Sequence, residues 1–560
     1  MRLHCYHIYQ IMKVLLTTIN SKYIHQNLAI GLLYELNKDY AGLAVKEFTA
    51  KTPFAEIAEY CSTFEVAAFS CYIWNIEPTL ATARQIKLLN PNCKILLGGP
   101  EVSYEWGDVI ARPEVDFIIV DEGEIPFAAF LRCYPNVPQV LGLIWKQNGE
   151  VICNDAPEDF DLNNLKGINP YLFIPTEELK NKVCYVEASR GCPNRCAFCL
   201  AGLQNKLRYL PEEYIHNSLL YLMENGRVIK FLDRTFNANQ SYAISIFQFI
   251  IEHHKPSNVF QFEIKADIYQ TELIEFIRAH VPKGIFRFEI GIQTLNAKSN
   301  KEVKRSQNFE NIKVYVQQVS HLVEVHLDLI VGLPYDYYDD IKYSFEEVFK
   351  LFAPELQLGF LKFLKGTPIR RDYKEHGYRF QQGPPYQVME SNYLSAQELE
   401  ELGHVEHALD IYWNKKRALH TLKYIALNHS IFDFLMGLGR YWGQRNERRN
   451  VGLIGVYTTI YDYAVQQFST DSLMTELIAL DYYLQHKIKP ATRFLREVDK
   501  KQRINAYKNL NLNHHKYRYA MHNVQFDVQQ LLANGAIVSK PDLLVVEFSG
   551  VEMPKVVGVK

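Results

Sequence analysis

Short runs of Val, Ile and Leu alternate with helix-length amphipathic stretches through residues 13–135. The apolar runs are KVLLTT, AVKEFT, EVAAFSCY, CKILLGGP and DFIIV, and the helical patterns fall at about 27–38, 53–62 and 78–89 and from Pro126. Strands that are apolar without alternation are typical of a parallel sheet covered on both faces. We therefore predict an α/β domain with a Rossmann-like, doubly wound sheet at 13–135. Residues 1–11, an upstream start or a tail, are left out of this fold.

A second rhythm of strands and helices covers residues 183–365. Strand-like runs at 183–187, VIKFLD, FQFEIKA, IFRFEIGI, EVHLDLIVG and LQLGFLKFL are separated by helical stretches near 211–225, 241–254, 271–280, 309–320 and 339–352. Six such repeats are typical of a parallel barrel or partial barrel, here a (βα)6 partial TIM barrel. In such barrels the chemistry gathers at the carboxyl ends of the strands.

The remaining segments give weaker patterns. Residues 136–182 are predicted to be a linker, with a hairpin at Asn148-Gly149. Residues 366–560 are predicted to form a mainly helical C-terminal domain, in which Ser395 is an N-cap with Glu398 three residues on. The last apolar runs, LLVVEFSG and MPKVVGVK, predict a small closing β element.

Charge excludes some partners and leaves one open. Lys and Arg total 61 against 63 Asp and Glu, so a net charge of -2 gives no bulk attraction for nucleic acid or anionic membrane. Residues 486–519 nevertheless hold ten Lys or Arg against two acids, with interleaved Phe and Tyr. Such a patch would suit phosphates and bases, but the favoured interpretation is a solvated helix face balanced by acids elsewhere.

The chain lacks the marks of a membrane or secreted protein. No apolar run approaches the ~20 residues that a membrane-spanning helix needs, and the N-terminus has no secretory signal pattern. We therefore expect a cytoplasmic protein without membrane contact. In a reducing compartment clustered thiols are more often ligands than disulfides.

Three of the ten cysteines, Cys192, Cys196 and Cys199, lie within the run GCPNRCAFC, and the others show no mutual spacing. A structural zinc site needs four ligands, and the nearest downstream histidine, His216, is in a predicted helix. A ferredoxin-type cluster also needs a fourth cysteine, and none follows Cys199. The spacing therefore predicts an iron–sulfur cluster with one iron left open for substrate or cofactor.

This CxxxCxxC loop, with its preceding strand VCYVEASRG, Pro193 and aromatic Phe198, resembles the motif of the radical SAM superfamily. The resemblance implies a [4Fe-4S] cluster on the three cysteines, bound S-adenosylmethionine (SAM), and an external flavodoxin- or ferredoxin-like electron donor. It also implies that Gln293 and Asp328 contact the SAM ribose, that Arg305 contacts the methionine carboxylate, and that Gly332 shapes the adenine side. The other SAM-pocket residues that it implies are Phe198, Glu263, Glu289 and, for the methionine amino group, Asp233.

The stretches LLGGPEVSYE and VDFIIVDEGEIPF resemble the cobalamin-binding domain that precedes the radical core in many cobalamin-dependent radical SAM enzymes. By this resemblance Ser70, Gly98 and Gly99 would contact the nucleotide tail of cobalamin. The DxHxxG motif that supplies a cobalt ligand in other cobalamin proteins has no match. His25 is wrongly spaced for it and is not assigned to cobalt.

The whole arrangement resembles an uncharacterised branch of these proteins with a C-terminal domain of unknown function. The expected activity is radical-mediated modification, with methylation the reaction that cobalamin would add, of a substrate that the sequence does not identify. Two alternatives stay open: a radical SAM enzyme whose first domain has become a scaffold without cobalamin, and a non-catalytic cobalamin or cluster sensor. Oligomeric state is equally undetermined.

Overall fold

The computed structural model of the chain describes residues 12–557 except 205, 269, 447–450 and 469–470. The proposed tail at 1–11 therefore lies outside the described residues. The chain divides into two compact units. The first comprises the residues up to Gly291 with Lys298–Glu324 and Phe360–Asn392, and the second comprises Ile292–Ala297, Val325–Gly359 and the residues from Tyr393 on.

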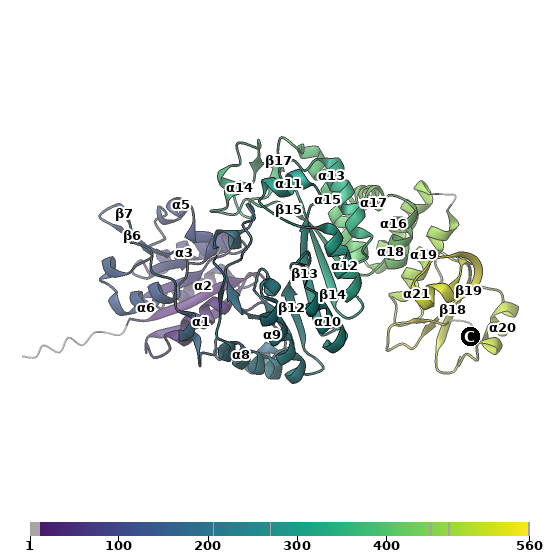
Figure 1. Cartoon of the computed structure of the whole chain (residues 1–560), viewed down its shortest axis with the longest axis horizontal. Helices are drawn as coiled ribbons and strands as arrows, with labels where there is room; N and C mark the ends of the chain where they lie inside the picture. Colours follow the sequence, from purple (N-terminus) through teal and green to yellow (C-terminus); the bar gives the residue numbers. More distant parts are fainter. Residues whose placement is uncertain (1–11, 205, 269, 447–450, 469–470, 558–560) are drawn as a thin grey trace, which may run out of the picture. The chain divides into compact units, whose positions relative to one another are not determined.

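Within the described residues, seven strands form the first sheet, in the order β2-β1-β3-β4-β5-β6-β7. This domain is the purple and blue part of Figure 1. The first five run parallel: β1 (Val14–Asn20), β2 (Leu43–Thr49), β3 (Val66–Ser70), β4 (Lys94–Gly98) and β5 (Phe117–Ile119). The order reverses between β1 and β3, and ligands of open α/β sheets bind beyond the carboxyl ends of the strands at such a switch point. The doubly wound domain predicted from the sequence is confirmed.

Helices cover both faces of this sheet. On one face lie α2 (Phe54–Cys61), α3 (Ile76–Leu89), α4 (Pro100–Ser103) and α5 (Gly107–Ile110), and on the other lie α1 (Leu28–Leu36) and α6 (Glu124–Cys133). Successive strand residues therefore pack into two different cores. Leu15 lies in the first core, beneath α2 and α3, and Leu16 lies in the second core, beneath α1 and α6. Burial on both faces is why the strands read as unbroken apolar runs.

The hairpin predicted at Asn148-Gly149 is present, as β6 (Leu143–Gln147) and β7 (Glu150–Cys153). Both turn residues have positive φ, 52° and 86°, which matches the right-handed twist of a hairpin. β6 pairs antiparallel with β5, so the hairpin extends the first sheet instead of belonging to a separate connector. The buried side chains of Leu143 and Trp145 pack into the second core, which explains the attachment.

A six-stranded sheet with the order β15-β14-β13-β12-β11-β8 forms the second α/β element among the described residues. Its strands are β8 (Val183–Val186), β11 (Val228–Phe231), β12 (Val259–Glu263), β13 (Phe286–Gln293), β14 (Glu324–Val331) and β15 (Glu355–Phe360). The alternating helices are α8 (Glu212–Asn225), α9 (Gln240–His253), α10 (Thr271–His280), α12 (Phe309–Val319) and α13 (Tyr338–Phe349), and a short α11 (Ala297–Glu302) follows β13. The predicted (βα)6 arrangement is confirmed.

Phenylalanines build much of the core between this sheet and α9. The ring of Phe247, on α9, lies 4.9 Å from that of Phe262 on β12 and 4.7 Å from that of Phe286 on β13. Each buried Phe contributes roughly 1.5–3 kcal/mol by leaving water. This packing fixes the strands whose carboxyl ends carry the candidate site.

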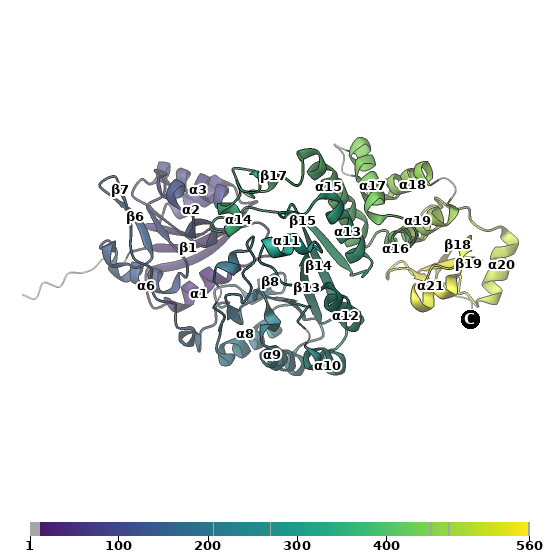
Figure 2. The same cartoon turned by 45° about the horizontal axis from the view of Figure 1, so that its top comes forward.

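The second unit is mainly helical (Figure 2). Its helices include α15 (Ala396–Leu409), α16 (Leu419–Asn428), α17 (Ile431–Asn446), α18 (Leu453–Gln467) and α19 (Ser472–Leu484). The predicted cap of α15 is confirmed: Ser395 Oγ accepts from Glu398 N (3.2 Å), and Ser395 N donates to the Glu398 carboxylate (2.8 Å). Among the described residues, no helix combines the length and the apolar character that crossing a membrane requires.

The chain closes with a small α/β module, which we define as residues 498–557. Its three-stranded antiparallel sheet consists of β18 (Arg518–Phe526), β19 (Ser539–Phe548) and β20 (Lys555–Val556), and its helices are α20 (Lys500–Asn509) and α21 (Val528–Asn534). The predicted β element is therefore present. The pattern missed β18, because this strand begins inside the basic stretch.

Candidate active site

The three clustered cysteines lie on one loop in the first unit. The loop runs between β9 (Ser189–Arg190) and β10 (Arg208–Tyr209), which pair antiparallel and close its base. Cys192 N donates to Gln204 O (3.0 Å). Gly191 has a φ of 88°, and a Cβ there would lie 2.4 Å from the Lys206 carbonyl oxygen. Only glycine therefore allows the loop to fold back in this way.

Each of the three sulfurs has a polar or cationic neighbour. Cys192 Sγ lies 3.5 Å from both Thr235 Oγ1 and Asn194 Nδ2, and Cys196 Sγ lies 3.8 Å from a guanidinium nitrogen of Arg305. Burial raises the pKa of Cys199, and the positive charge of Arg234 opposes the shift. Donors and cations favour the thiolate, the form that binds iron.

The loop does not form a site for a single metal ion. All three cysteines are free, and within the described ranges no group of three or more His, Cys, Asp or Glu side chains is arranged to hold one ion. A tetrahedral zinc site would bring its sulfurs to about 3.8 Å from one another. In an iron–sulfur cluster each thiolate binds a different iron, so the ligands stand farther apart. Three thiols on one loop, one for each of three irons, match the donor set of such a cluster, whereas a structural zinc site takes four ligands.

Polar residues at the ends of β11, β12 and β13 surround the same loop region. Asp233, 3% exposed, accepts from Ala188 N (3.0 Å) and from the Ser189 hydroxyl (2.5 Å), and burial raises its pKa to about 7. It thus ties the end of β8 to the segment after β11. Glu263 pairs with Arg234 (2.9 Å), a residue that the sequence prediction did not assign to the site.

Glu289 and Arg305 are also engaged within the protein. The Glu289 carboxylate binds Lys230 Nζ at 2.8 Å, and the Arg305 guanidinium donates to the Gly291 carbonyl and to Gln307 (3.0 Å). Phe198 is half-buried on the cysteine loop. The structure therefore brings Arg305 and Phe198 to the cysteines, while Glu289 forms an ion pair along the sheet.

Three predicted SAM residues belong to the second unit. Gln293 ends β13 with a φ of 70°, and its Oε1 is buried without a hydrogen-bond partner among the described residues. Such an orphaned buried acceptor is typical of a position that a ligand completes. Asp328, on β14, lies 3.2 Å from His326 Nε2, and Gly332 is buried directly after β14 with a φ of 94°.

The predicted cobalamin residues meet at the carboxyl ends of β3 and β4. Cys71 N donates to Gly98 O (2.7 Å), and Asn27 Nδ2 donates to Ser70 Oγ (3.2 Å). Gly99 has a φ of 104°, and a Cβ there would lie 2.6 Å from the Cys71 carbonyl oxygen. Ser70, Gly98 and Gly99 therefore form one edge, next to the switch point of the sheet.

His25, the one histidine of the first domain among its described residues, is bonded through Nδ1 to the Tyr185 hydroxyl (2.8 Å). Close to Ser70, Trp74 is 54% exposed and stacks on Tyr72 with ring centroids 4.5 Å apart. The exposed indole, backed by the half-buried Tyr72 ring, is a flat apolar surface at a strand end that the sequence pattern did not single out. An apolar, glycine-lined edge of this kind fits a large planar cofactor, and it offers that cofactor no histidine.

A buried ion cluster links the first domain to the cysteine loop, and the sequence did not predict it. Arg190, on β9, contacts Glu124 (2.6 Å), Glu187 (3.2 Å) and Glu122 (3.3 Å). Arg208, on β10, also binds Glu122. Burial lowers the pKa of Arg190, but the three carboxylates outweigh it and raise that pKa. The residues before and after the cysteine loop are thus both fixed to the loop after β5.

A second contact joins the first domain to the segment after β15. Glu101, on α4, accepts from the Tyr386 hydroxyl (2.5 Å) and pairs with Lys365 (3.2 Å), and Arg370 binds Glu105 (2.8 Å). In the sequence, the only sign of this contact was Glu101, the acidic residue directly after Gly98-Gly99-Pro100. Partners 264 to 285 residues apart cannot be found from spacing.

Three protein families match the chain. Residues 14–131 match the B12 binding domain, residues 186–348 match the radical SAM superfamily, and residues 374–539 match DUF4080, a protein family of unknown function. The cofactor of the first family is cobalamin. The cofactors of the second are a [4Fe-4S] cluster and SAM.

Among curated proteins, the chain is 29% identical over 185 residues to the 2-(S-pantetheinyl)-carbapenam-3-carboxylate methyltransferase of Streptantibioticus cattleyicolor, which covers 30% of this chain and 27% of that protein. It is 27% identical over 186 residues to the cobalamin-dependent radical SAM methyltransferase TokK of Streptomyces tokunonensis, again 30% of this chain and 27% of that protein. The match thus spans about a quarter of the length of these relatives.

Two solved structures share the fold. OxsB, a cobalamin-dependent SAM radical enzyme with aqua-cobalamin bound, aligns with a TM-score of 0.59 at 15% identity, covering 85% of this chain and 79% of OxsB. The radical SAM methyltransferase TsrM of Kitasatospora setae, with cobalamin and a [4Fe-4S] cluster bound, aligns at 0.55 and 10% identity, covering 67% and 78%. The chain thus combines, in this order, a region that matches the B12 binding domain, one that matches the radical SAM superfamily and one that matches DUF4080.

Proposed function

We propose that this chain is a cobalamin-dependent radical SAM methyltransferase whose substrate is unidentified. The observation that carries the proposal is the loop of Cys192, Cys196 and Cys199, in which three thiols each lie beside a donor or a cation and no fourth cysteine follows. The bound cofactors would supply radical chemistry and methyl transfer.

The chain's own residues would bind and shield these cofactors. Cys192 and Cys196 are 6% and 7% exposed, so water has little access to their sulfurs. Asn194 and Arg305 would stabilise the thiolates by donating to them. Asp233 would hold the end of β8 in register with the loop, and the Gln293 amide would complete its bonding with a ligand.

Methylation is favoured by the companion domain. The B12 binding domain lies in the same compact unit as the cysteine loop and is joined to it by the Arg190 cluster. Two curated relatives that match part of the chain are methyltransferases by name. Reduction of the cluster would come from an external flavodoxin- or ferredoxin-like protein.

A second candidate keeps the radical chemistry and makes the first domain a scaffold. It is favoured by one observation: His25 is bonded to Tyr185 and is not spaced as a cobalt ligand. The two candidates differ in whether the first domain retains cobalamin.

Both candidates are tested by anaerobic reconstitution with iron and sulfide, with and without hydroxocobalamin, followed by SAM and dithionite. We expect 5′-deoxyadenosine both with and without hydroxocobalamin. We expect S-adenosylhomocysteine, the product that SAM leaves after it donates its methyl group, only with hydroxocobalamin. Cys196→Ala should abolish both products, while Cys153→Ala, at an exposed free cysteine, should keep them. Cleavage without cobalamin retention would favour the scaffold, and no cleavage by cluster-loaded protein would favour a sensor.

A further inference from the structure

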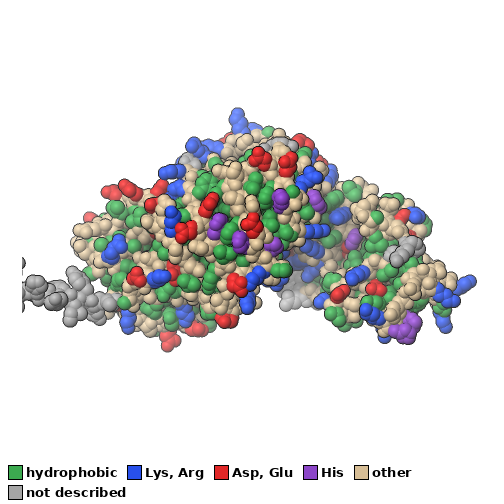
Figure 3. All heavy atoms as spheres, turned by 60° about the horizontal axis from the view of Figure 1, so that its bottom comes forward, with side chains coloured by type: hydrophobic (Ala, Val, Ile, Leu, Met, Phe, Trp, Pro, Cys, Tyr) green, Lys and Arg blue, Asp and Glu red, His purple; other side chains and the backbone are tan. Residues whose placement is uncertain are grey.

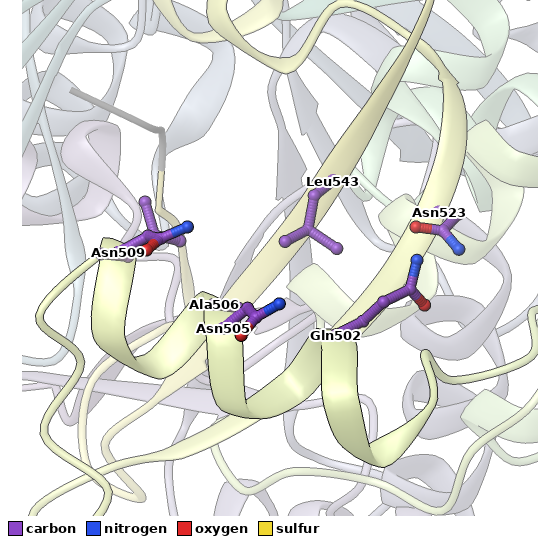
Figure 4. Close-up of a pocket in the computed structure, with 7 residues that line it drawn as sticks. Gln502, Asn505, Ala506, Asn509, Asn523 and Leu543 are labelled. Atoms are coloured by element: carbon purple, nitrogen blue, oxygen red, sulfur yellow. The ribbon is translucent and has the colours of Figure 1, made fainter.

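The C-terminal module, defined above as residues 498–557, carries a groove of about 250 Å³ between helix α20 and its sheet (Figure 4). Its floor is apolar and includes Ala506 from the helix and Leu543 from β19. Side-chain amides surround this floor: Gln502, Asn505 and Asn509 from α20, and Asn523 from β18.

These four amides are available to a ligand. Among the described residues, none of their side chains forms a hydrogen bond within the protein, and all four are exposed. Each amide group offers two N–H donors and a carbonyl acceptor. Asn is a poor helix former, so its two occurrences in the ten-residue α20 do not serve helix stability. The amides thus form a hydrogen-bonding surface with both donors and acceptors.

The stretch of chain that carries α20 is positively charged. Of the ten Lys and Arg in residues 486–519, only Lys489 and Arg503 form an ion pair with a described residue, and both bind the same carboxylate, Glu497. The other acid, Asp499, is used as the N-cap of α20, accepting from Gln502 N (2.7 Å). Figure 3 shows Lys and Arg side chains projecting at the right-hand end of the view, where this module lies.

The local pairing argues against the balanced, solvated face expected from the sequence. Eight cations of the stretch have no carboxylate partner among the described residues, and four of them, Lys500, Lys501, Lys508 and Lys516, are exposed on or just after α20. A set of unpaired cations on the helix that carries the groove and on the residues after it attracts a polyanion.

Two exposed histidine rings follow the same helix, next to the half-buried ring of Tyr507. The rings of His514 and His515 are 4.0 Å apart, and the ring of Tyr507, on α20, is 5.7 Å from that of His514. Both histidines are exposed. Flat rings next to cations are the usual platform for unstacked bases.

We propose that this groove binds single-stranded nucleic acid, with the lysines on phosphates and the amides on base edges. Asn and Gln amides can pair with the donor and acceptor atoms of a base, and a folded duplex would hide those edges from so narrow a groove. An acidic peptide would offer its backbone to the amides, but unlike a nucleic acid it does not present a flat ring at every unit for His514 and His515 to stack on. This inference concerns binding alone and stands independently of the radical chemistry.

The test is fluorescence anisotropy of the full-length chain with a fluorescein-labelled 12-nucleotide RNA of mixed sequence and with DNA of the same sequence. We expect saturable binding that weakens with salt. Lys500→Glu with Lys501→Glu should weaken binding at least tenfold and flatten the salt dependence by about 1.4 in the log–log slope, since about 0.7 is expected per phosphate contact. A matched pair, Lys51→Glu with Lys166→Glu, makes the same charge change at exposed lysines of the first unit and should leave binding within twofold.

Asn505→Ala with Asn509→Ala separates base contacts from simple charge attraction. These changes favour the helix, so the module should keep its thermal midpoint. We expect at least tenfold weaker binding to the oligonucleotide and unchanged binding to heparin. A preference for RNA or for DNA would support the proposed binding site and show which of the two it binds. Equal binding would support a site that accepts either single strand. Absence of binding at low salt, unchanged affinity of the amide variant, or equal affinity for duplex would overturn it.

Discussion

Gly191 shows most clearly how single residues shape the candidate site. Gly191→Ala would place a Cβ 2.4 Å from the Lys206 carbonyl oxygen at a φ of 88°. We expect the loop to open and the reconstituted protein to hold less than about a fifth of the iron bound by the unaltered chain, measured as iron and acid-labile sulfide per chain.

Gly149 provides the matched control. Its φ is 86°, but a Cβ there meets nothing within 4 Å, so Gly149→Ala has the same backbone strain without the clash. Both substitutions cost about 1–3 kcal/mol in strain. Equal iron content in the two variants would contradict the role given to Gly191.

Asp336 gives a prediction about pH. This side chain is 1% exposed, its Oδ1 accepts from Thr294 Oγ1 (3.0 Å), and burial raises its pKa to about 8. Between about pH 4 and pH 8 the folded state keeps a proton that the unfolded state releases, so stability falls as pH rises through this range. The loss is of the order of a few kcal/mol.

Asp336→Asn removes this titration. We expect its thermal midpoint to exceed that of the unaltered chain above pH 8 and the difference to shrink toward pH 5. Asp339→Asn, at an exposed carboxylate of the same segment, should leave the pH profile unchanged. A profile in Asp336→Asn parallel to that of the unaltered chain would show that Asp336 does not carry the effect.

At the scale of elements, β9 and β10 hold the cysteine loop against the first domain through the Arg190 cluster. Arg190→Gln would leave the carboxylates of Glu122, Glu124 and Glu187 close together without their main cation. Breaking a buried ion pair from one side costs roughly 3–5 kcal/mol. We therefore expect a lower thermal midpoint together with faster loss of iron from the loaded protein.

Arg371→Gln, which removes an exposed pair with the neighbouring Asp372, is the comparison and should change neither quantity. If Arg190→Gln lowered the thermal midpoint but held iron as tightly as Arg371→Gln does, the ion pairs of Arg190 would stabilise the fold without helping the loop to retain iron.

Elements were predictable where their pattern was local. The apolar runs predicted the strands of both sheets, and Ser395 with Glu398 predicted the start of α15, because both signals lie within a few residues. The attachment of β6 to β5 and the pairs of Arg190 and Glu101 were not predictable, since each joins residues far apart in the chain. The cluster, SAM and cobalamin residues all remain predictions, although Gln293 and Arg305 now have geometric support.

At the scale of the whole molecule, three candidate sites lie in different parts of the chain. The first domain has the switch-point edge of Ser70, Gly98 and Gly99, the second α/β element carries the cysteine loop, and the C-terminal module has the amide groove. Charge shows why composition could not reveal the groove: a net charge of -2 hides one local set of unpaired lysines. These sites are recognised from where their residues lie in the fold, and the overall composition does not reveal them.

The central claim is that the three cysteines hold a cluster with one iron open to SAM. The most direct test is the electron paramagnetic resonance spectrum of the reconstituted, dithionite-reduced protein, recorded with and without SAM. The account predicts the signal of one [4Fe-4S] cluster per chain, with g values that shift when SAM is added and a signal that is lost in Cys196→Ala. A spectrum unaltered by SAM, or one that survives in Cys196→Ala, would contradict it.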